Sequence, residues 1–275
     1  MVSAGLSVHR GFFTQPSETE RALFRGVHYR RVVVTKPRPI TLYVLRIETR
    51  TPGLRFLVTP PDAPGAELPL RARTASAFLR EHRLQAAINA DFFYPWKSSN
   101  ALDYYPHNGD PVTVEGDAVS NGVRYASRDH PKLVTLYISQ DNRPSLNPPK
   151  NGQPWNALGA HPLLANGVSL VEGGGAREPR TAAGWTADGA ILYLVCADGR
   201  QPGYSEGATL AELVSYFRSV GVRDAVNLDG GGSTALVVAG KAGSSQVLNR
   251  PIDQRIPGKE RFVANHLGIY APPLP

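Results

Sequence analysis

The sequence predicts a sheet-rich α+β fold: a single domain of mixed α/β composition with few helices and a surface cavity at its strand ends. Its 275 residues, 41% of them hydrophobic, are sufficient to bury one large core. The 27 glycines and 24 prolines separate many short apolar runs, which is typical of strands joined by turns. Long stretches with the helical period are scarce. We expect residues 1–28 to form an N-terminal extension and residues 29–275 to form the domain.

The N-terminal half reads as strands with one short helix. Thr74 is an N-cap candidate for that helix, because apolar residues follow it on one helical face. Residues 92–110 are rich in aromatic, Pro, Asn and Gly residues, and we expect them to form a long ordered loop. The predicted strands, rich in β-branched and aromatic residues, cover residues 29–34, 41–47, 54–59 and 84–89.

The C-terminal half is more regular. Residues 180–185 and 191–196 form a predicted hairpin through the turn signal Asp188-Gly189. A second helix begins at Thr209, with Glu212 completing a capping box, and Gly221 ends it. The chain then returns through two further predicted strands, over residues 225–229 and 234–238, which three glycines separate.

Composition excludes several classes of protein. The net charge of +7 suits an anionic substrate, but the basic residues are dispersed and not interleaved with aromatics, so we expect no nucleic-acid partner. The only cysteine, Cys196, lies in an apolar run, which excludes an intramolecular disulfide and favours a buried thiol. No stretch is long enough to span a bilayer.

The glycine-rich turn is the first candidate site. Asp229 ends an apolar strand and precedes Gly230, Gly231 and Gly232, so its carboxylate stands beside backbone with no side chains to block a ligand. Successive amides can form an anion site, to which the Ser233 hydroxyl adds a donor. The alternative is an ordinary tight hairpin. The turn lacks the lysine of a nucleotide-binding P-loop.

Two arginines are expected at the open end of the 180–196 hairpin. Arg180 begins its first strand and Arg200 follows its second. Because guanidinium groups bind phosphate oxygens in bidentate fashion, the pair forms a candidate phosphate clamp. The alternative is a surface ion pair with Asp198 or Glu178.

Polar residues beside aromatics suggest a sugar site. Asn89 and Asp91 end a predicted strand and precede an aromatic run that includes Phe93. Ring faces stack on sugars while amides and carboxylates bind hydroxyls. The alternative is a core aromatic cluster capped by Asn89.

His161 is a lone histidine, which is more often structural. The sequence has no histidines and carboxylates at the spacing typical of a metal site, so we expect no metal. The one alternative that remains is a Ca²⁺ ion bound to Asp229 or Asp91.

These residues belong to a longer pattern, which resembles the phosphodiester glycosidase family. The order and spacing of the matching segments are more specific than any single motif. His161 departs from the expected pattern, and the residues before about 85 resemble the family only loosely. The segments that carry the resemblance are 89–93, 159–167, 180–184, 198–200, 207–213, 227–233 and, more weakly, 265–268.

The resemblance implies hydrolysis of a sugar-1-phosphodiester at the anomeric C–O bond, without an organic cofactor. Asp229 and Arg180 are the expected catalytic residues, with Asp91 as the alternative to Asp229. Two other functions stay open: a non-catalytic module that binds phosphosugars or envelope glycans, and a phosphodiesterase that cleaves at phosphorus. The expected substrate-binding residues are Asn89, Phe93, His161, Asp198, Arg200, Asn227, Gly230, Gly231, Gly232 and Ser233.

The expected substrate is a phosphorylated sugar or glycan, such as an exopolysaccharide. Because such substrates lie mostly outside the cytoplasm, we expect a protein that is secreted or in the cell envelope, its targeting segment absent from this chain. A cytoplasmic location stays open.

Overall fold

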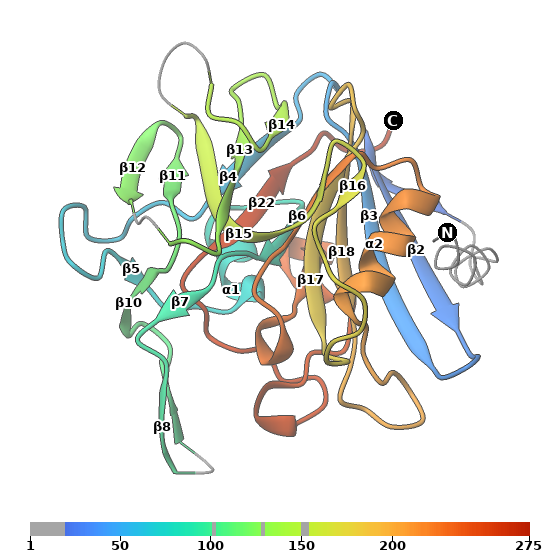
Figure 1. Ribbon diagram of the computed structural model, residues 1–275. Helices are drawn as coiled ribbons and strands as arrows, with labels where there is room; N and C mark the ends of the chain where they lie inside the picture. The colour runs from blue at the N-terminus through green and yellow to red at the C-terminus, as the bar shows by residue number, and fades with distance from the viewer. Residues whose placement is uncertain (1–19, 101–102, 128–129, 150–153) are drawn as a thin grey trace.

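The computed structural model shows a layered α+β domain (Figure 1). Two antiparallel sheets pack face to face, and each carries one helix on its outer face. The smaller sheet is covered by α1 (Ala75–Glu81) and the larger one by α2 (Leu210–Ser219). The predicted sheet-rich α+β class with few helices is confirmed. The structure describes residues 20–100, 103–127, 130–149 and 154–275.

The larger sheet contains twelve strands among the described residues, and its neighbours pair in antiparallel fashion. Its main path runs in the order β1 (Arg21–Phe24), β2 (Val27–Val34), β3 (Ile40–Glu48), β18 (Ile191–Ala197), β17 (Arg180–Trp185), β19 (Asp224–Asn227), β15 (Asn156–Ala165), β11 (Ala118–Ser120) and β12 (Val123–Ala126). Off this path lie β13 (Val134–Ile138), β14 (Pro144–Ser145) and β16 (Val168–Ser169).

The smaller sheet has the strand order β21 (Ser245–Val247), β20 (Leu236–Ala239), β6 (Ala86–Asn89), β22 (His266–Tyr270) and β4 (Arg55–Val58). Two minor sheets lie beside it, one of β5 (Leu70–Arg71), β10 (Pro111–Val114) and β7 (Phe93–Tyr94), the other of β8 (Lys97–Asn100) and β9 (Asp103–Tyr105). Three short 3₁₀ helices complete the fold: η1 (Gly231–Ser233), η2 (Lys241–Gly243) and η3 (Asp253–Arg255).

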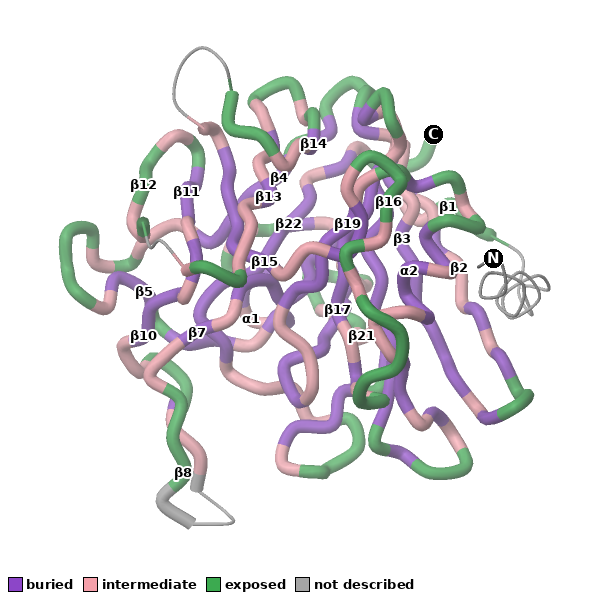
Figure 2. Tube along the Cα trace, in the orientation of Figure 1, coloured by how far each residue is buried: buried purple, intermediate pink, exposed green. Residues whose placement is uncertain are grey.

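The largest core cluster lies between the two sheets, where Figure 2 shows mostly buried chain. Alternate residues of β18 point to opposite faces of the larger sheet. Leu194 and Cys196 therefore pack toward the smaller sheet, while Val195 packs beneath Phe217 of α2. Because both faces of β18 are covered, its sequence is continuously apolar. Cys196 is the buried free thiol expected from its sequence context.

Both predicted helices and the predicted hairpin are confirmed. The Thr74 side chain accepts from the backbone of Ala77 at the start of α1. At α2 the Thr209 and Glu212 side chains form the complete capping box, and Gly221 follows the helix with a φ of 78°. β17 and β18 pair along their length and turn back through Gly189.

Two expectations about the N-terminal half are corrected. The sheet begins before the expected boundary at residue 28, because β1 and β2 pair and Val27 is fully buried in the core. Residues 1–19 lie outside the described residues. Residues 92–110 are not a loop throughout, since they contain β7, β8 and β9. Thr113 of β10 pairs with Tyr94 of β7, so the beginning of this segment is a strand of a minor sheet.

The side chain of Asn89, at the end of β6, joins the two sheets. Its Nδ2 donates to the Asp229 carbonyl at 2.6 Å. Its Oδ1 accepts from Thr181 Oγ1 of β17 at 2.8 Å and from the Ala235 amide at 3.1 Å. Asn89 is only 1% exposed, so water cannot replace these partners. Asn89 is therefore a buried structural residue, as the alternative to a sugar-binding role supposed. It joins strands of the two sheets, however, and does not cap an aromatic cluster.

Replacing Asn89 by alanine is expected to lower the free energy of unfolding by about 3 kcal/mol, because buried donors and acceptors lose their partners. Urea unfolding followed by circular dichroism measures this. Asn108→Ala, at an exposed position, is the matched control and should change stability by less than about 0.5 kcal/mol. Equal effects of the two substitutions would refute the structural role of Asn89.

Among the described residues, no helix combines the length and apolarity that crossing a bilayer requires.

Candidate active site

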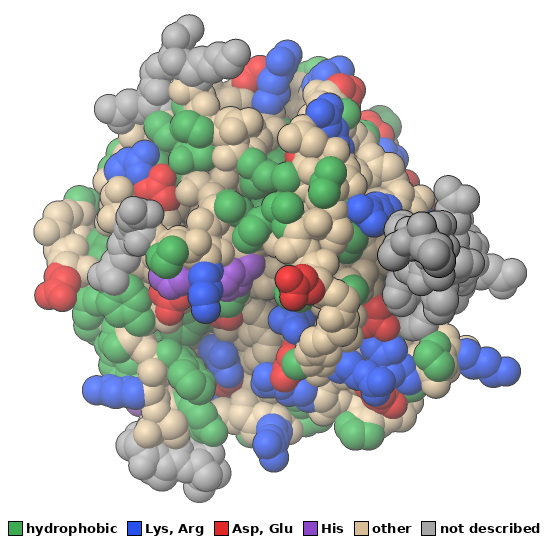
Figure 3. Space-filling model, in the orientation of Figure 1, with side chains coloured by type: hydrophobic (Ala, Val, Ile, Leu, Met, Phe, Trp, Pro, Cys, Tyr) green, Lys and Arg blue, Asp and Glu red, His purple; other side chains and the backbone are tan. Residues whose placement is uncertain are grey.

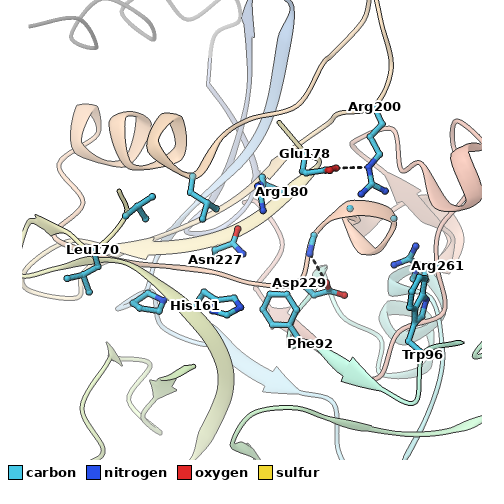
Figure 4. Close-up of a pocket in the computed structure, with 16 residues that line it drawn as sticks. Phe92, Trp96, His161, Leu170, Glu178, Arg180, Arg200, Asn227, Asp229 and Arg261 are labelled. Atoms are coloured by element: carbon cyan, nitrogen blue, oxygen red, sulfur yellow. Dashed lines mark hydrogen bonds and ion pairs between the residues drawn. The ribbon is translucent and has the colours of Figure 1, made fainter. Parts of the chain in front are cut away.

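A surface pocket of about 720 Å³ opens at the ends of β17 and β19 (Figure 4). The expected cavity at strand ends is therefore present. In Figure 4 Asp229 lies near its centre, Arg180 and Arg200 on one side, and Leu170 and His161 toward one end. The pocket is lined by Phe92, Trp96, His161, Pro162, Leu170, Val171, Glu178, Arg180, Arg200, Leu210, Asn227, Asp229, Gly230, Gly231, Gly232 and Arg261.

The glycine-rich turn connects the two sheets and is not a hairpin. The strand before it, β19, belongs to the larger sheet, whereas the strand after it, β20, belongs to the smaller one. The Gly231 amide donates to the Pro179 carbonyl at 2.8 Å, with φ of 60°. A Cβ on Gly230 would lie 2.7 Å from that same oxygen, and one on Gly232 would collide with Arg261. Close packing explains the run of glycines.

Two of the three glycine amides that were expected to bind an anion already donate hydrogen bonds within the protein. Besides the Gly231 amide, that of Gly230 donates to its neighbour Asp229 Oδ1 at 2.9 Å. The Gly232 amide alone of the three has no partner among the described residues. Backbone therefore offers an anion one donor here, and most positive charge must come from side chains.

Asp229 is a half-buried carboxylate at the centre of the pocket. It accepts from the Ser233 hydroxyl and the Gly230 amide, and the Arg261 guanidinium lies near it. Burial raises the pKa of Asp229 to about 6, and the negative charge of Glu115 adds to the rise. The Ser233 side chain is buried, and its hydroxyl positions Asp229 instead of lining the pocket.

Arg180 and Arg200 both reach the pocket, as expected for a clamp. Arg180 is held by two backbone carbonyls, that of Ala208 at 3.2 Å from Nε and that of Ala176 at 2.9 Å from Nη2. Arg200 Nε donates to Glu178 Oε2 at 2.6 Å, so the ion-pair alternative is also correct for Arg200. The two readings are compatible, because the pair fixes a guanidinium that still lines the pocket.

A third arginine, Arg261, also lines the pocket and adds positive charge to it. Arg261 donates from Nε to Asp253 Oδ1 at 2.7 Å, and its guanidinium lies 5.4 Å from the ring centre of Trp96. Its Nη1 approaches Ser233 Oγ at 3.3 Å. Sequence reasoning missed Arg261, because it stands in an irregular segment without a motif and far along the chain from the glycine turn.

Asn227 and His161 line the pocket from paired strands, as their register in β19 and β15 requires. Asn227 Nδ2 donates to the Leu228 carbonyl, while its Oδ1 has no partner among the described residues. The His161 ring lies 4.9 Å from that of Phe92, edge to face, and its Nδ1 is 3.0 Å from the Lys132 carbonyl oxygen. The Asn227 Oδ1 is a buried acceptor beside the pocket, and the rings of Phe92 and His161 form an aromatic wall in it.

Asp91 lies behind the pocket rather than in it. Its Oδ2 accepts from the Gly159 amide at 3.0 Å, and a Cβ on Gly116 or Gly159 would lie within 3 Å of this carboxylate. Burial raises the pKa of Asp91 well above its usual range. Because Asp91 is only 1% exposed and does not line the pocket, it is poorly placed to contact a substrate.

Asp198 is also buried and away from the pocket lining. It accepts from Asn249 Nδ2 at 3.0 Å, the Arg250 amide at 2.9 Å and the Tyr204 hydroxyl at 3.1 Å. Burial raises the pKa of Asp198 to about 6 despite these donors. Asp198 therefore fixes the segment beside Arg200. Asn89, as described above, has a similar supporting position.

Phe93 packs in a hydrophobic cluster and lines a second recess, of about 340 Å³, beside the main pocket. The two cavities share four residues, among them Asp229 and Arg261. The recess also contains Glu115, a carboxylate that sequence reasoning did not select. It is lined by Phe92, Phe93, Tyr94, Trp96, Glu115, Asp229 and Arg261.

Charge and metal binding complete the description. Figure 3 shows Lys and Arg side chains distributed over the visible face with acidic groups among them. Among the described residues, no group of three or more His, Cys, Asp or Glu side chains could hold a metal ion.

Comparison with solved structures shows the fold. The catalytic domain of zebrafish N-acetylglucosamine-1-phosphodiester alpha-N-acetylglucosaminidase, auto-inhibited by its pro-peptide, matches with a TM-score of 0.65 and 18% identity, over 93% of this chain and 87% of that one. A hypothetical protein from Synechocystis matches with a TM-score of 0.57 and 16% identity, over 94% of this chain and 64% of that one. The chain thus spans less than two thirds of the Synechocystis protein.

Sequence comparison shows the family. No curated protein sequence matches the chain. The family model for phosphodiester glycosidases matches residues 82–270, which include the glycine-rich turn and every residue that lines the pocket. By this match over more than half of its length, the chain belongs to the phosphodiester glycosidase family.

Proposed function

We propose that the protein hydrolyses a sugar-1-phosphodiester between the anomeric carbon and the bridging oxygen, releasing the sugar and a phosphomonoester. One observation carries the proposal: the carboxylate of Asp229 and the guanidinium groups of Arg180, Arg200 and Arg261 line the same pocket. Membership of the phosphodiester glycosidase family supports a hydrolase of this type.

The arginines would bind the phosphate group. Guanidinium groups match phosphate oxygens in geometry and stay charged at neutral pH. Negative charge grows on the leaving phosphate as the C–O bond breaks, and fixed positive groups stabilise it. Because a phosphomonoester leaves more easily than the alkoxide of an ordinary glycoside, the site needs less help from a proton donor.

The remaining surfaces of the pocket would hold the sugar. Phe92 and Trp96 offer ring faces, and Trp96 is 49% exposed. Asn227 also lines the pocket, although its Oδ1 is buried and would need a small shift of the side chain to accept from a sugar hydroxyl. Leu170 and His161 form an apolar wall at the opposite end from Trp96. We extend the proposal to a phosphorylated glycan as the substrate. Because such glycans lie mostly outside the cytoplasm, we also propose that the protein is secreted or in the cell envelope.

Asp229 would stabilise positive charge at the anomeric carbon. Its pKa of about 6 leaves it mostly ionised at pH 7. Of the two carboxylates expected to compete for this role, Asp229 alone lines the pocket, while Asp91 is enclosed behind it.

Variants of the pocket should lose turnover of the methyl diester of N-acetylglucosamine-1-phosphate. Asp229→Asn and Arg180→Ala are each expected to lower kcat by about 10²- to 10³-fold, because each removes a charge that stabilises the transition state. Asp141→Asn and Arg177→Ala change exposed charges outside the pocket and serve as matched controls. Liberated sugar is quantified by mass spectrometry. Near-wild-type rates in both folded pocket variants would refute the assignment.

The rate should also depend on the ionisation of Asp229. Below pH 6 the carboxylate becomes protonated, so kcat/KM should fall about tenfold per pH unit. The positive charge of Arg261 lowers the pKa of Asp229, whereas the negative charge of Glu115 raises it. Arg261→Gln should therefore move this acid limb to higher pH, as a pH–rate profile measures. An unmoved limb would assign it to another group, such as Asp198.

A further inference from the structure

Glu115 is a carboxylate in the catalytic region that the mechanism above does not use. It directly follows β10, and its amide donates to the Phe92 carbonyl at 2.8 Å, which fixes its backbone beside the pocket. Glu115 and Asp229 line the same recess of about 340 Å³, which adjoins the main pocket. Two carboxylates therefore line one recess, which adjoins the pocket proposed to hold the substrate.

The two carboxylates differ in their surroundings. Asp229 accepts from Ser233 and Gly230 and lies near Arg261, so its position and charge are fixed. The half-buried side chain of Glu115 has neither a hydrogen-bond donor nor an ion-pair partner among the described residues. A carboxylate with unpartnered oxygens in a recess is free to accept hydrogen bonds from water.

The charge of Glu115 acts on two neighbouring acids, one of which, Asp229, lines the same recess. This negative charge contributes to the raised pKa of both Asp229 and Asp91, while the charge of Arg261 acts on Asp229 in the opposite sense. Asp229 and Arg261 line the same recess as Glu115, whereas Asp91 does not. Asp91 is enclosed and Glu178 is paired with Arg200, so Glu115 is the second carboxylate, beside Asp229, that is open to a substrate.

We infer that Glu115 is the general base that holds and deprotonates the water attacking the anomeric carbon, while Asp229 stabilises that carbon. This inference rests on the hydrolysis proposed above. The water oxygen bonds to the anomeric carbon, and its proton passes to a Glu115 oxygen. The C–O bond to phosphate breaks, and its electron pair stays on the phosphate oxygen beside the arginines. Glu115 then returns the proton to solvent, which leaves a free sugar and a phosphomonoester.

Glu115→Gln tests the inference on the full chain. The amide keeps the shape of the side chain but cannot take a proton, so kcat for the methyl diester of N-acetylglucosamine-1-phosphate should fall by about 10²- to 10⁴-fold with little change in KM. Glu67→Gln, at an exposed position outside both cavities, is the matched control and should keep wild-type turnover.

Rescue by azide separates a base from a structural residue. In Glu115→Ala, azide needs no deprotonation and can attack the anomeric carbon in place of water, so it should restore turnover at least tenfold and yield a sugar azide. The same addition to Asp229→Ala should restore less, because the charge that stabilises the carbon is missing there. Rescue also demonstrates that the variant is folded.

The outcomes distinguish this inference from the proposed function. Wild-type turnover with an unchanged rate in Glu115→Gln would overturn the role of Glu115 and leave the hydrolase proposal intact. A slow Glu115→Gln variant combined with no azide rescue in Glu115→Ala would also overturn it. Absence of turnover in the wild-type protein on a panel of sugar-1-phosphodiesters would overturn both proposals together.

Discussion

The geometry of the site depends on the hydrogen bonds that the Asn89 side chain makes to both sheets. Asn89 stands at the end of the smaller sheet, and it binds Thr181 of the larger sheet and the Asp229 carbonyl at once. The chain crosses between the sheets through Asp229 and three glycines. A buried amide is therefore required to hold the crossover, and with it the central carboxylate, against both layers. Asn89, which the sequence suggested as a sugar ligand, instead holds the two sheets together.

Ion pairs within the protein orient the positive charges of the pocket. Arg200 uses its Nε for Glu178, and Arg261 uses its Nε for Asp253. Each bond restricts the side chain through one edge of the guanidinium and leaves other nitrogens for a ligand. Asp229 lines the same pocket as these arginines and carries a raised pKa because burial outweighs its donors. Preorganised opposite charges of this kind suit a reaction that separates a sugar cation from a phosphate.

Local patterns in the sequence predicted much of the fold, whereas contacts between distant segments decided the site. The capped helix after Thr209 and the hairpin from Arg180 depend on neighbouring residues, so spacing and turn chemistry sufficed to predict them. Asp91 ends a strand as expected, yet two glycines from other segments close over it, which no local pattern indicates. Glu115 and Arg261 reach the cavities only because minor sheets and an irregular segment pack beside the glycine turn. The family resemblance supplied the order of the segments but not these additional residues.

The position of bond cleavage is the central claim, and hydrolysis in ¹⁸O-labelled water tests it most directly. Attack on the anomeric carbon places the label in the released sugar, and mass spectrometry of both products locates it. A pocket that combines the Asp229 carboxylate with aromatic rings and arginines predicts labelled sugar and unlabelled phosphomonoester. Label in the phosphomonoester instead would mean attack on phosphorus, and the account of a glycosidase would be wrong.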